Sequence, residues 1–196
     1  VTLHNSGNPN LSYIASVFDV AHDSGRSTGL YASKSKFVLF EQSYNSSNGA
    51  PDITGADDGN DKIDSYVNES TGSPSNASNL HADFLADMAA SRFNYSWIHY
   101  RDPDSAGHAS GWGSSGWDDS IKDIDDYIGD ILALIEGDVL LDGNTIIILT
   151  SDHGWGMGEK DYLYKNSLWQ ESTRVPLIVR APGVGKVKGV SSQPVS

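Results

Sequence analysis

Hydrophobic positions along the chain change their spacing several times, and these changes predict alternating helices and strands. Apolar side chains three and four residues apart are typical of helices with one buried face. Short apolar runs between polar residues are typical of strands. Helical spacing occurs over residues 11–24, 79–92 and 115–136. Apolar runs predict two short strands around Lys34 and Lys36, and further strands at 95–100, 146–150 and 174–183.

The strand expected at residues 146–150 is a continuous apolar run, which is typical of a strand buried on both faces of a parallel sheet. Alternating helices and strands indicate an α/β fold with a mostly parallel central sheet flanked by helices. Ligands of such folds bind beyond the carboxyl ends of the strands. The segments that follow the strands are therefore the places to look for a site.

The amino-acid composition excludes several classes of function for this protein. The chain has 196 residues, of which 38% are hydrophobic, so it can bury the core of one domain. It contains no cysteine, which excludes disulfides and thiolate metal ligands. The net charge of −13 supplies no basic surface for nucleic acid. No apolar stretch is long enough to cross a bilayer.

Two Asp/His pairs carry the candidate chemistry. Asp104 and His108 follow the strand that ends near Tyr100, and Asp152 and His153 follow the strand at 146–150. Neighbouring strands lie about 5 Å apart, so two loops that leave them can converge. Carboxylate oxygen and imidazole nitrogen bind zinc, and carboxylates also suit calcium or magnesium. Each pair alone is more often a capped turn than a pair of ligands, but the two pairs together favour a metal site.

Other polar residues have simpler interpretations. His22 and His81 lie on amphipathic segments, where we expect surface or interface positions. Lys34 and Lys36 are candidate substrate contacts, but surface lysines are the simpler interpretation. Asp104 and His108 are expected to lie in a Gly/Ser-rich loop over residues 101–114.

The motifs "DPDSAGH" (102–108), "TIIILTSDHG" (145–154) and "STRVPLIVRAPGV" (172–184) together resemble the alkaline phosphatase superfamily. The resemblance is greatest to its type I phosphodiesterase/nucleotide pyrophosphatase branch. It implies hydrolysis of small phosphate mono- or diesters with two divalent metal ions, commonly zinc. Asp104 and His108 would bind one ion, and Asp152 and His153 the other.

The resemblance also implies a Thr or Ser nucleophile upstream of Val1. We therefore expect residues 1–196 to be a single catalytic-domain fragment that lacks the strand carrying the nucleophile and the C-terminal end. Without the nucleophile, this fragment alone is expected to have little or no turnover. The implied location is the periplasm, the cell surface or the exterior of the cell.

The segment after His153 is similar to the sulfatase branch of the same superfamily. There, one calcium ion is bound by an Asp-His or Asp-Asn pair, and a lysine contacts the sulfate. Lys165, twelve residues after His153, matches that lysine, although a surface loop lysine is an equal alternative. A third hypothesis is a non-catalytic fragment or binding domain that keeps the fold.

Overall fold

The computed structural model describes residues 16–49, 59–71, 77–156, 161, 165 and 168–183. The chain divides into two compact units, residues 1–134 and 135–196. The expectation of one catalytic domain over the whole chain stays a prediction.

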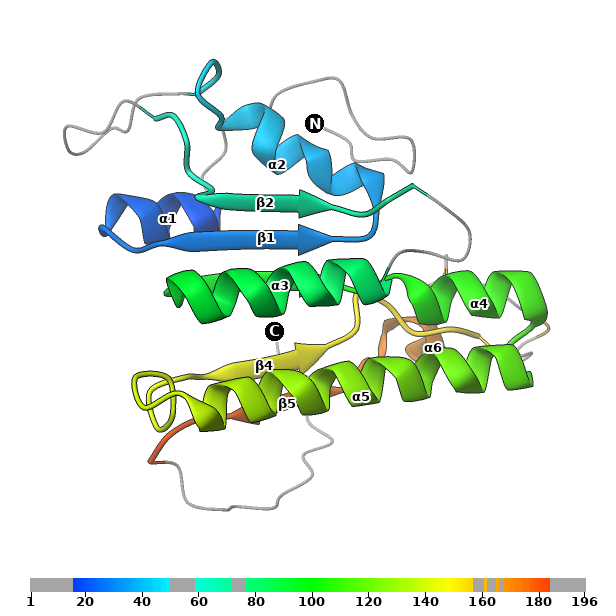
Figure 1. Cartoon of the computed structure of the whole chain (residues 1–196). Helices are drawn as coiled ribbons and strands as arrows, with labels where there is room; N and C mark the ends of the chain where they lie inside the picture. The colour runs from blue at the N-terminus through cyan, green and yellow to red at the C-terminus, as the bar shows by residue number, and fades with distance from the viewer. Residues whose placement is uncertain are drawn as a thin grey trace. The chain divides into compact units, whose positions relative to one another are not determined.

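The first unit is built on a three-stranded parallel sheet (Figure 1). Its strands are β1 (Thr28–Ala32), β2 (Ser65–Asn68) and β3 (Tyr95–His99), in the order β2-β1-β3. The central strand β1 is buried along its whole length. The predicted α/β fold with a parallel sheet is therefore confirmed, whereas β2 had not been predicted because its four residues carry no distinctive apolar pattern.

Helices cover both faces of β1, because successive side chains of a strand point to opposite sides. On one side, α1 (Val17–Asp23), the 3-10 turn η1 (Ser35–Phe37) and α2 (Val38–Ser43) accompany a core of Phe18, Leu30, Ala32 and Phe37. On the other side lies α3 (Ala77–Ser91), whose Phe84 ring meets the Tyr31 ring edge-on at 5.2 Å.

The helix predicted at 11–24 is observed as α1, and residues 11–15 lie outside the described part of the chain. A capping box starts α1: the Ser16 amide donates to Asp19, and the Asp19 amide donates to the Ser16 hydroxyl. Gly25 follows the helix with φ +66°, a left-handed conformation that glycine favours at helix ends.

The second strand predicted around Lys36 is wrong, because residues 35–43 form η1 and α2. Short apolar runs fit either a strand or a buried helix, and packing decides between them. Here the helix buries both Leu39 and Ser43 on one side, and the Ser43 hydroxyl donates to the Leu39 carbonyl at 2.6 Å.

The predicted helices at 79–92 and 115–136 are confirmed as α3 and α5 (Ser115–Gly137). The hydroxyl of Ser114 accepts a hydrogen bond from the Trp117 amide at 3.3 Å, as expected of a residue that caps α5. Of the surface and interface positions expected for His81, the interface is observed, because its side chain is buried between α3 and α5. None of the helices among the described residues is long and apolar enough to cross a bilayer.

The loop predicted at 101–114 is also wrong, because residues 102–110 form the helix α4 (Asp102–Ser110). Pro103 sits in its first turn, where its missing N–H costs nothing. Asp102 and Asp104 occupy the same turn, and their negative charge is favourable at the positive end of the helix dipole.

The second unit contains the end of α5, strand β4 (Ile147–Thr150), the short helix α6 (Gln170–Thr173) and strand β5 (Leu177–Arg180). The two strands pair antiparallel, with Ile148 opposite Val179. The predicted buried parallel strand at 146–150 is therefore wrong. The chain reverses direction before β5, and the side chains of Ile148 and Val179 remain 63% and 56% exposed.

Candidate functional site

The parallel strands bring the start of α4 to the carboxyl edge of the sheet. The hydroxyl and the amide of Ser33, which follows β1, both donate to the carbonyl of His99 at the end of β3, at 3.0 and 3.1 Å. The Arg101 amide donates to the Ser33 hydroxyl at 2.8 Å. This small network fixes the turn from which α4 begins.

Asp104 and His108 lie one helical turn apart on α4, so their side chains share a face. The Asp104 Oδ1 and His108 Nε2 atoms are 3.5 Å apart. The carboxylate is half-buried and the imidazole is exposed. The structure thus brings this predicted pair together.

Lys34 is the residue that the sequence interpretation missed. Its Nζ lies 3.3 Å from Asp104 Oδ2, and its side chain is only 16% exposed, so the expected surface lysine is wrong. The Asn68 amide group donates to the Lys34 carbonyl at 3.3 Å and ties it to the end of β2. The available signal was positional, since Lys34 and Asp104 both follow strands that pair directly.

Trp112 stands beside His108, with ring centroids 5.0 Å apart and planes at 77°. Its indole lies against the backbone of Gly107, where a Cβ atom would overlap it. The absence of a side chain at Gly107 therefore lets the indole ring approach the backbone. Trp112 covers α4 next to the imidazole of His108.

In the second unit, Asp152 and His153 follow β4, with Asp152 Oδ1 and His153 Nε2 3.6 Å apart. His153 Nδ1 lies 2.9 Å from the Gly154 carbonyl, which can only accept. Nδ1 therefore carries a hydrogen, and in the tautomer with that single ring hydrogen the lone pair lies on Nε2. Metal-binding histidines are oriented in this way by a hydrogen bond at the other ring nitrogen.

Lys165 lies near this pair in sequence and is oriented by an aromatic ring. Its Nζ is 5.9 Å from the centroid of the Trp155 ring, within the range of a cation–π contact.

Both pairs have the spacing of two ligands on one ion. Ligands about 2.0–2.1 Å from a tetrahedral zinc ion are about 3.4 Å apart. The observed separations are 3.5 Å in the first pair and 3.6 Å in the second. Within the described ranges, no group of three or more His, Asp or Glu side chains is placed to hold an ion. The pairs belong to different units, so their convergence stays a prediction.

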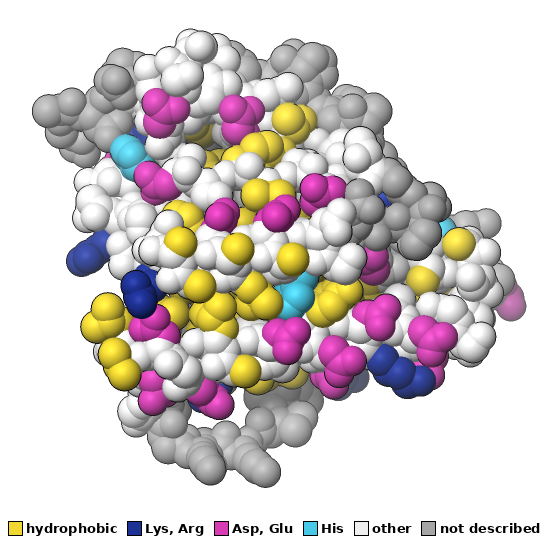
Figure 2. Space-filling view, viewed as in Figure 1, with side chains coloured by type: hydrophobic (Ala, Val, Ile, Leu, Met, Phe, Trp, Pro, Cys, Tyr) yellow, Lys and Arg dark blue, Asp and Glu magenta, His cyan; other side chains and the backbone are white. Residues whose placement is uncertain are grey.

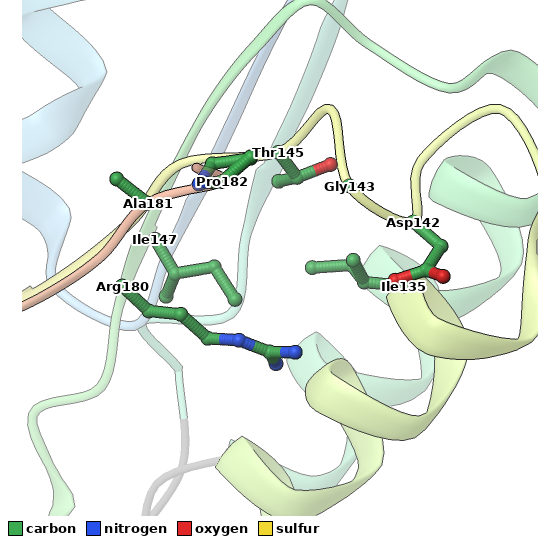
Figure 3. A pocket seen from close by; sticks show the side chains of 8 residues that line it. All are labelled: Ile135, Asp142, Gly143, Thr145, Ile147, Arg180, Ala181 and Pro182. Carbon is green, nitrogen blue, oxygen red and sulfur yellow. The ribbon is translucent and has the colours of Figure 1, made fainter. Parts of the chain in front are cut away.

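A pocket of about 210 Å³ lies elsewhere in the second unit (Figure 3). It is lined by residues that include Ile135, Asp142 and Arg180, and the Arg180 guanidinium extends across it toward α5. Arg180 donates to Glu136 Oε1 at 2.7 Å. Ile147, at the start of β4, also lines the pocket, whereas Asp152 and His153 follow the other end of that strand. The pocket is thus separate from the predicted site.

Acidic side chains are scattered over the face in Figure 2, with few Lys or Arg side chains among them. This distribution matches the net charge of −13. The expected lack of a nucleic-acid partner stays a prediction.

A family model described as type I phosphodiesterase / nucleotide pyrophosphatase matches residues 16–188. Among curated proteins, iduronate 2-sulfatase of Mus musculus is 42% identical over 64 residues, 33% of this chain and 11% of that enzyme. The ulvan-active sulfatase of Formosa agariphila is 44% identical over 70 residues, 34% of this chain and 13% of that enzyme. The matched segments thus span about a tenth of these relatives.

Among solved structures, murine ectonucleotide pyrophosphatase / phosphodiesterase 5 is similar over 71% of this chain and 32% of its own, with 22% identity and a TM-score of 0.46. An inactive form of that protein in complex with AMP gives the same TM-score.

The family match covers most of the chain and includes both Asp/His pairs, so the resemblance noted in the sequence is confirmed. The chain belongs to the type I phosphodiesterase / nucleotide pyrophosphatase family of the alkaline phosphatase superfamily.

Proposed function

We propose that this chain is part of a metal-dependent hydrolase of phosphate mono- or diesters. Asp104 and His108 hold one divalent cation, and Asp152 and His153 hold a second. The observation that carries the proposal is the spacing within the pairs, 3.5 and 3.6 Å between carboxylate oxygen and imidazole nitrogen. Mixed oxygen and nitrogen ligands favour zinc. The proposal assigns no nucleophile among residues 1–196.

Two bound cations supply positive charge that stabilises the oxygens of a phosphoryl group in transfer. The chain's own residues provide and orient the ligands. The Gly154 carbonyl fixes the His153 ring with Nε2 available. The Lys34 ammonium balances the half-buried Asp104 carboxylate when no cation is bound.

The first experiment measures zinc binding by calorimetry to residues 1–196 and their variants, and hydrolysis of a p-nitrophenyl phosphodiester by a chain that also carries the upstream nucleophile. Asp104→Asn and His153→Ala are expected to weaken zinc binding at least tenfold, since each removes a ligand. Asp118→Asn, which removes an exposed carboxylate from an ion pair on α5, serves as the matched control and should change nothing. Equal zinc binding by all variants would contradict the assignment of the ligands.

Lys34 offers a second test of the first pair. Lys34→Met is expected to tighten zinc binding about twofold to fivefold, because a half-buried ion pair worth up to ~1 kcal/mol no longer competes for Asp104. The measurement is the zinc dissociation constant at fixed pH and salt. Weaker binding by this variant would mean that Lys34 orients Asp104 for the ion instead of competing with it.

A second candidate function is sulfate-ester hydrolysis with one calcium ion at Asp152 and His153 and with Lys165 as the substrate contact. It is favoured by the sulfatase relatives and by the orientation of Lys165 over Trp155. The test is hydrolysis of p-nitrophenyl sulfate with calcium by a chain that also carries the upstream nucleophile. Lys165→Met should abolish it, while the exposed Lys122→Met on α5 leaves it unchanged.

A non-catalytic domain that keeps the fold is the third candidate, and it predicts metal binding without turnover of either ester. As part of the same proposal, residues 1–196 are a fragment of one catalytic domain. Its compartment is the periplasm, the cell surface or the cell exterior, which the family resemblance supports.

A further inference from the structure

We propose that His81 is a positioning residue that fastens both ends of the chain segment carrying Asp104 and His108. The inference rests on the proposed function for its metal-binding consequence, but its structural part stands on contacts within the first unit alone. His81 lies on α3, outside the predicted site, and its side chain is 5% exposed.

Both ring nitrogens of His81 are engaged. Nδ1 lies 3.0 Å from the Tyr100 hydroxyl, and Nε2 lies 3.3 Å from Asp130 Oδ2. The ring also stacks on Tyr127, with centroids 4.4 Å apart and planes at 18°. The imidazole therefore contacts the residue directly after β3 and two residues of α5.

The direction of these hydrogen bonds follows from the partners. An ionised Asp130 can only accept, so Nε2 carries the hydrogen and Nδ1 accepts from the Tyr100 hydroxyl. Burial, followed by the charges of Tyr127, Asp102 and Asp130, raises the pKa of Tyr100, so its hydroxyl keeps the hydrogen that it donates. A neutral imidazole thus satisfies both contacts.

An imidazole among buried apolar neighbours on α3, such as Leu80 and Phe84, is costly unless its nitrogens are hydrogen-bonded. An apolar side chain would fill the same space without that requirement. The two hydrogen bonds are therefore the feature that distinguishes His81 from the rest of the buried face of α3.

The effect of these two hydrogen bonds depends on where Tyr100 and Asp130 lie in the sequence. Tyr100 comes directly before the turn into α4, and Asp130 lies near the end of the part of α5 that belongs to the first unit. The segment 101–129 between them carries Asp104 and His108. Figure 1 shows α3 running alongside α5, and His81 joins them to the end of β3. The His81 side chain thus holds both ends of the segment 101–129.

Holding the ends of a segment together limits the conformations it can adopt. Without the two hydrogen bonds, α4 can open while the β1–β3 pairing remains intact. His81 therefore keeps Asp104 and His108 in the arrangement seen in the structure, and does so through Tyr100 and Asp130 without touching either ligand.

The test is hydrogen exchange of backbone amides in His81→Phe, which keeps a ring of similar size and removes both hydrogen bonds. The backbone amides of α4 should exchange roughly tenfold faster or more, as expected when two ordinary hydrogen bonds are lost. The same is expected of the amide of Gly111, which follows α4 and donates to the Gly107 carbonyl at 3.0 Å. The exchange rates of the β1 amides should change only as far as the global stability of the protein changes. Met88→Leu, another buried position on α3, is the matched control.

A purely structural role would accelerate α4 and β1 equally in both variants, and that result would overturn the proposal. Tyr100→Phe should accelerate α4 as well, and adding it to His81→Phe should give little further change because both remove the same bond. His81→Asn, which can still accept from the Tyr100 hydroxyl, should restore part of the protection.

Zinc binding separates this proposal from the proposed function. If the unaltered protein binds no zinc but His81→Phe selectively opens α4, the metal assignment fails and the positioning role stands. If zinc binds and His81→Phe changes neither α4 exchange nor zinc affinity, the positioning role fails and the metal assignment stands.

Discussion

Replacing Lys62 by methionine tests whether the core of the first unit depends on a buried ion pair. The Lys62 side chain is 0% exposed. Its Nζ contacts the Asp23 carboxylate and lies 3.6 Å from Asp19 Oδ1. Its backbone carbonyl accepts from the Thr28 hydroxyl at 2.9 Å, so the residue joins α1, β1 and the segment that precedes β2.

The magnitude follows from what the substitution leaves behind. Methionine fills most of the same volume, so little packing is lost. Asp19 is only 5% exposed and would keep a buried negative charge without its cation. Breaking one side of a buried ion pair in this way costs about 3–5 kcal/mol. Asp23 is partly exposed and adds less.

The matched control is Lys122→Met on α5. Lys122 Nζ lies 2.6 Å from Asp118 Oδ2, a closer contact than that of Lys62 with Asp19, but both partners are exposed. Such a solvent-exposed pair between positions i and i+4 of a helix contributes little to the free energy of unfolding. Both lysines have a carboxylate in close contact, so distance does not separate the two variants, whereas burial predicts a larger loss for Lys62→Met.

The assay is equilibrium unfolding in urea, followed by tryptophan fluorescence and circular dichroism, with the free energy of unfolding extrapolated to water. The double variant Asp19→Asn/Lys62→Met should recover part of the loss, because it leaves no unpaired charge. A Lys62→Met variant within about 1 kcal/mol of Lys122→Met would refute the reasoning, since a loss that small fits a solvated lysine.

Two further predictions concern α4 and the buried tyrosines. Gly107→Ala is expected to destabilise the protein by about 1–3 kcal/mol, because the new methyl group overlaps the Trp112 indole. The methyl group of Gly129→Ala on α5 meets no atom within 4 Å, and this variant should stabilise the protein by up to ~1 kcal/mol. Both variants are measured in the same urea unfolding assay. Burial raises the pKa of Tyr31 and of Tyr100, so the folded state holds these phenolic protons more tightly than the unfolded chain does. Their contribution to stability is complete below the ordinary tyrosine pKa of about 10 and is lost as the pH rises above it, and Tyr100→Phe should flatten this loss in unfolding measured across that range.

The sequence by itself determined the elements whose evidence is local. The spacing of apolar residues predicted α3 and α5 because one face of each long helix is buried, and the motifs around Asp104 and Asp152 placed the chain in its family. The closeness of Asp104 and His108 rests on local geometry as well, because residues four apart meet on a helix, but the loop expected at 101–114 did not predict the helix α4 that brings them together.

Other features were decided by contacts between segments far apart in the chain. The apolar run around residue 148 predicts a strand but contains no information about its partner, and pairing with β5 made it antiparallel. The apolar residues after Lys34 fit a strand or a helix equally, and packing against the sheet selected the helix.

The partners of Lys34 and His81 likewise depend on the tertiary structure. Lys34 meets Asp104 because β1 and β3 pair in parallel and both residues follow the ends of these strands. His81 is buried because α5 returns alongside α3 and supplies an acceptor for one ring nitrogen, while Tyr100 supplies a donor for the other. Hydrophobic periodicity reports which side of an element is buried, whereas the partner of a polar side chain is set by chain folding over tens of residues.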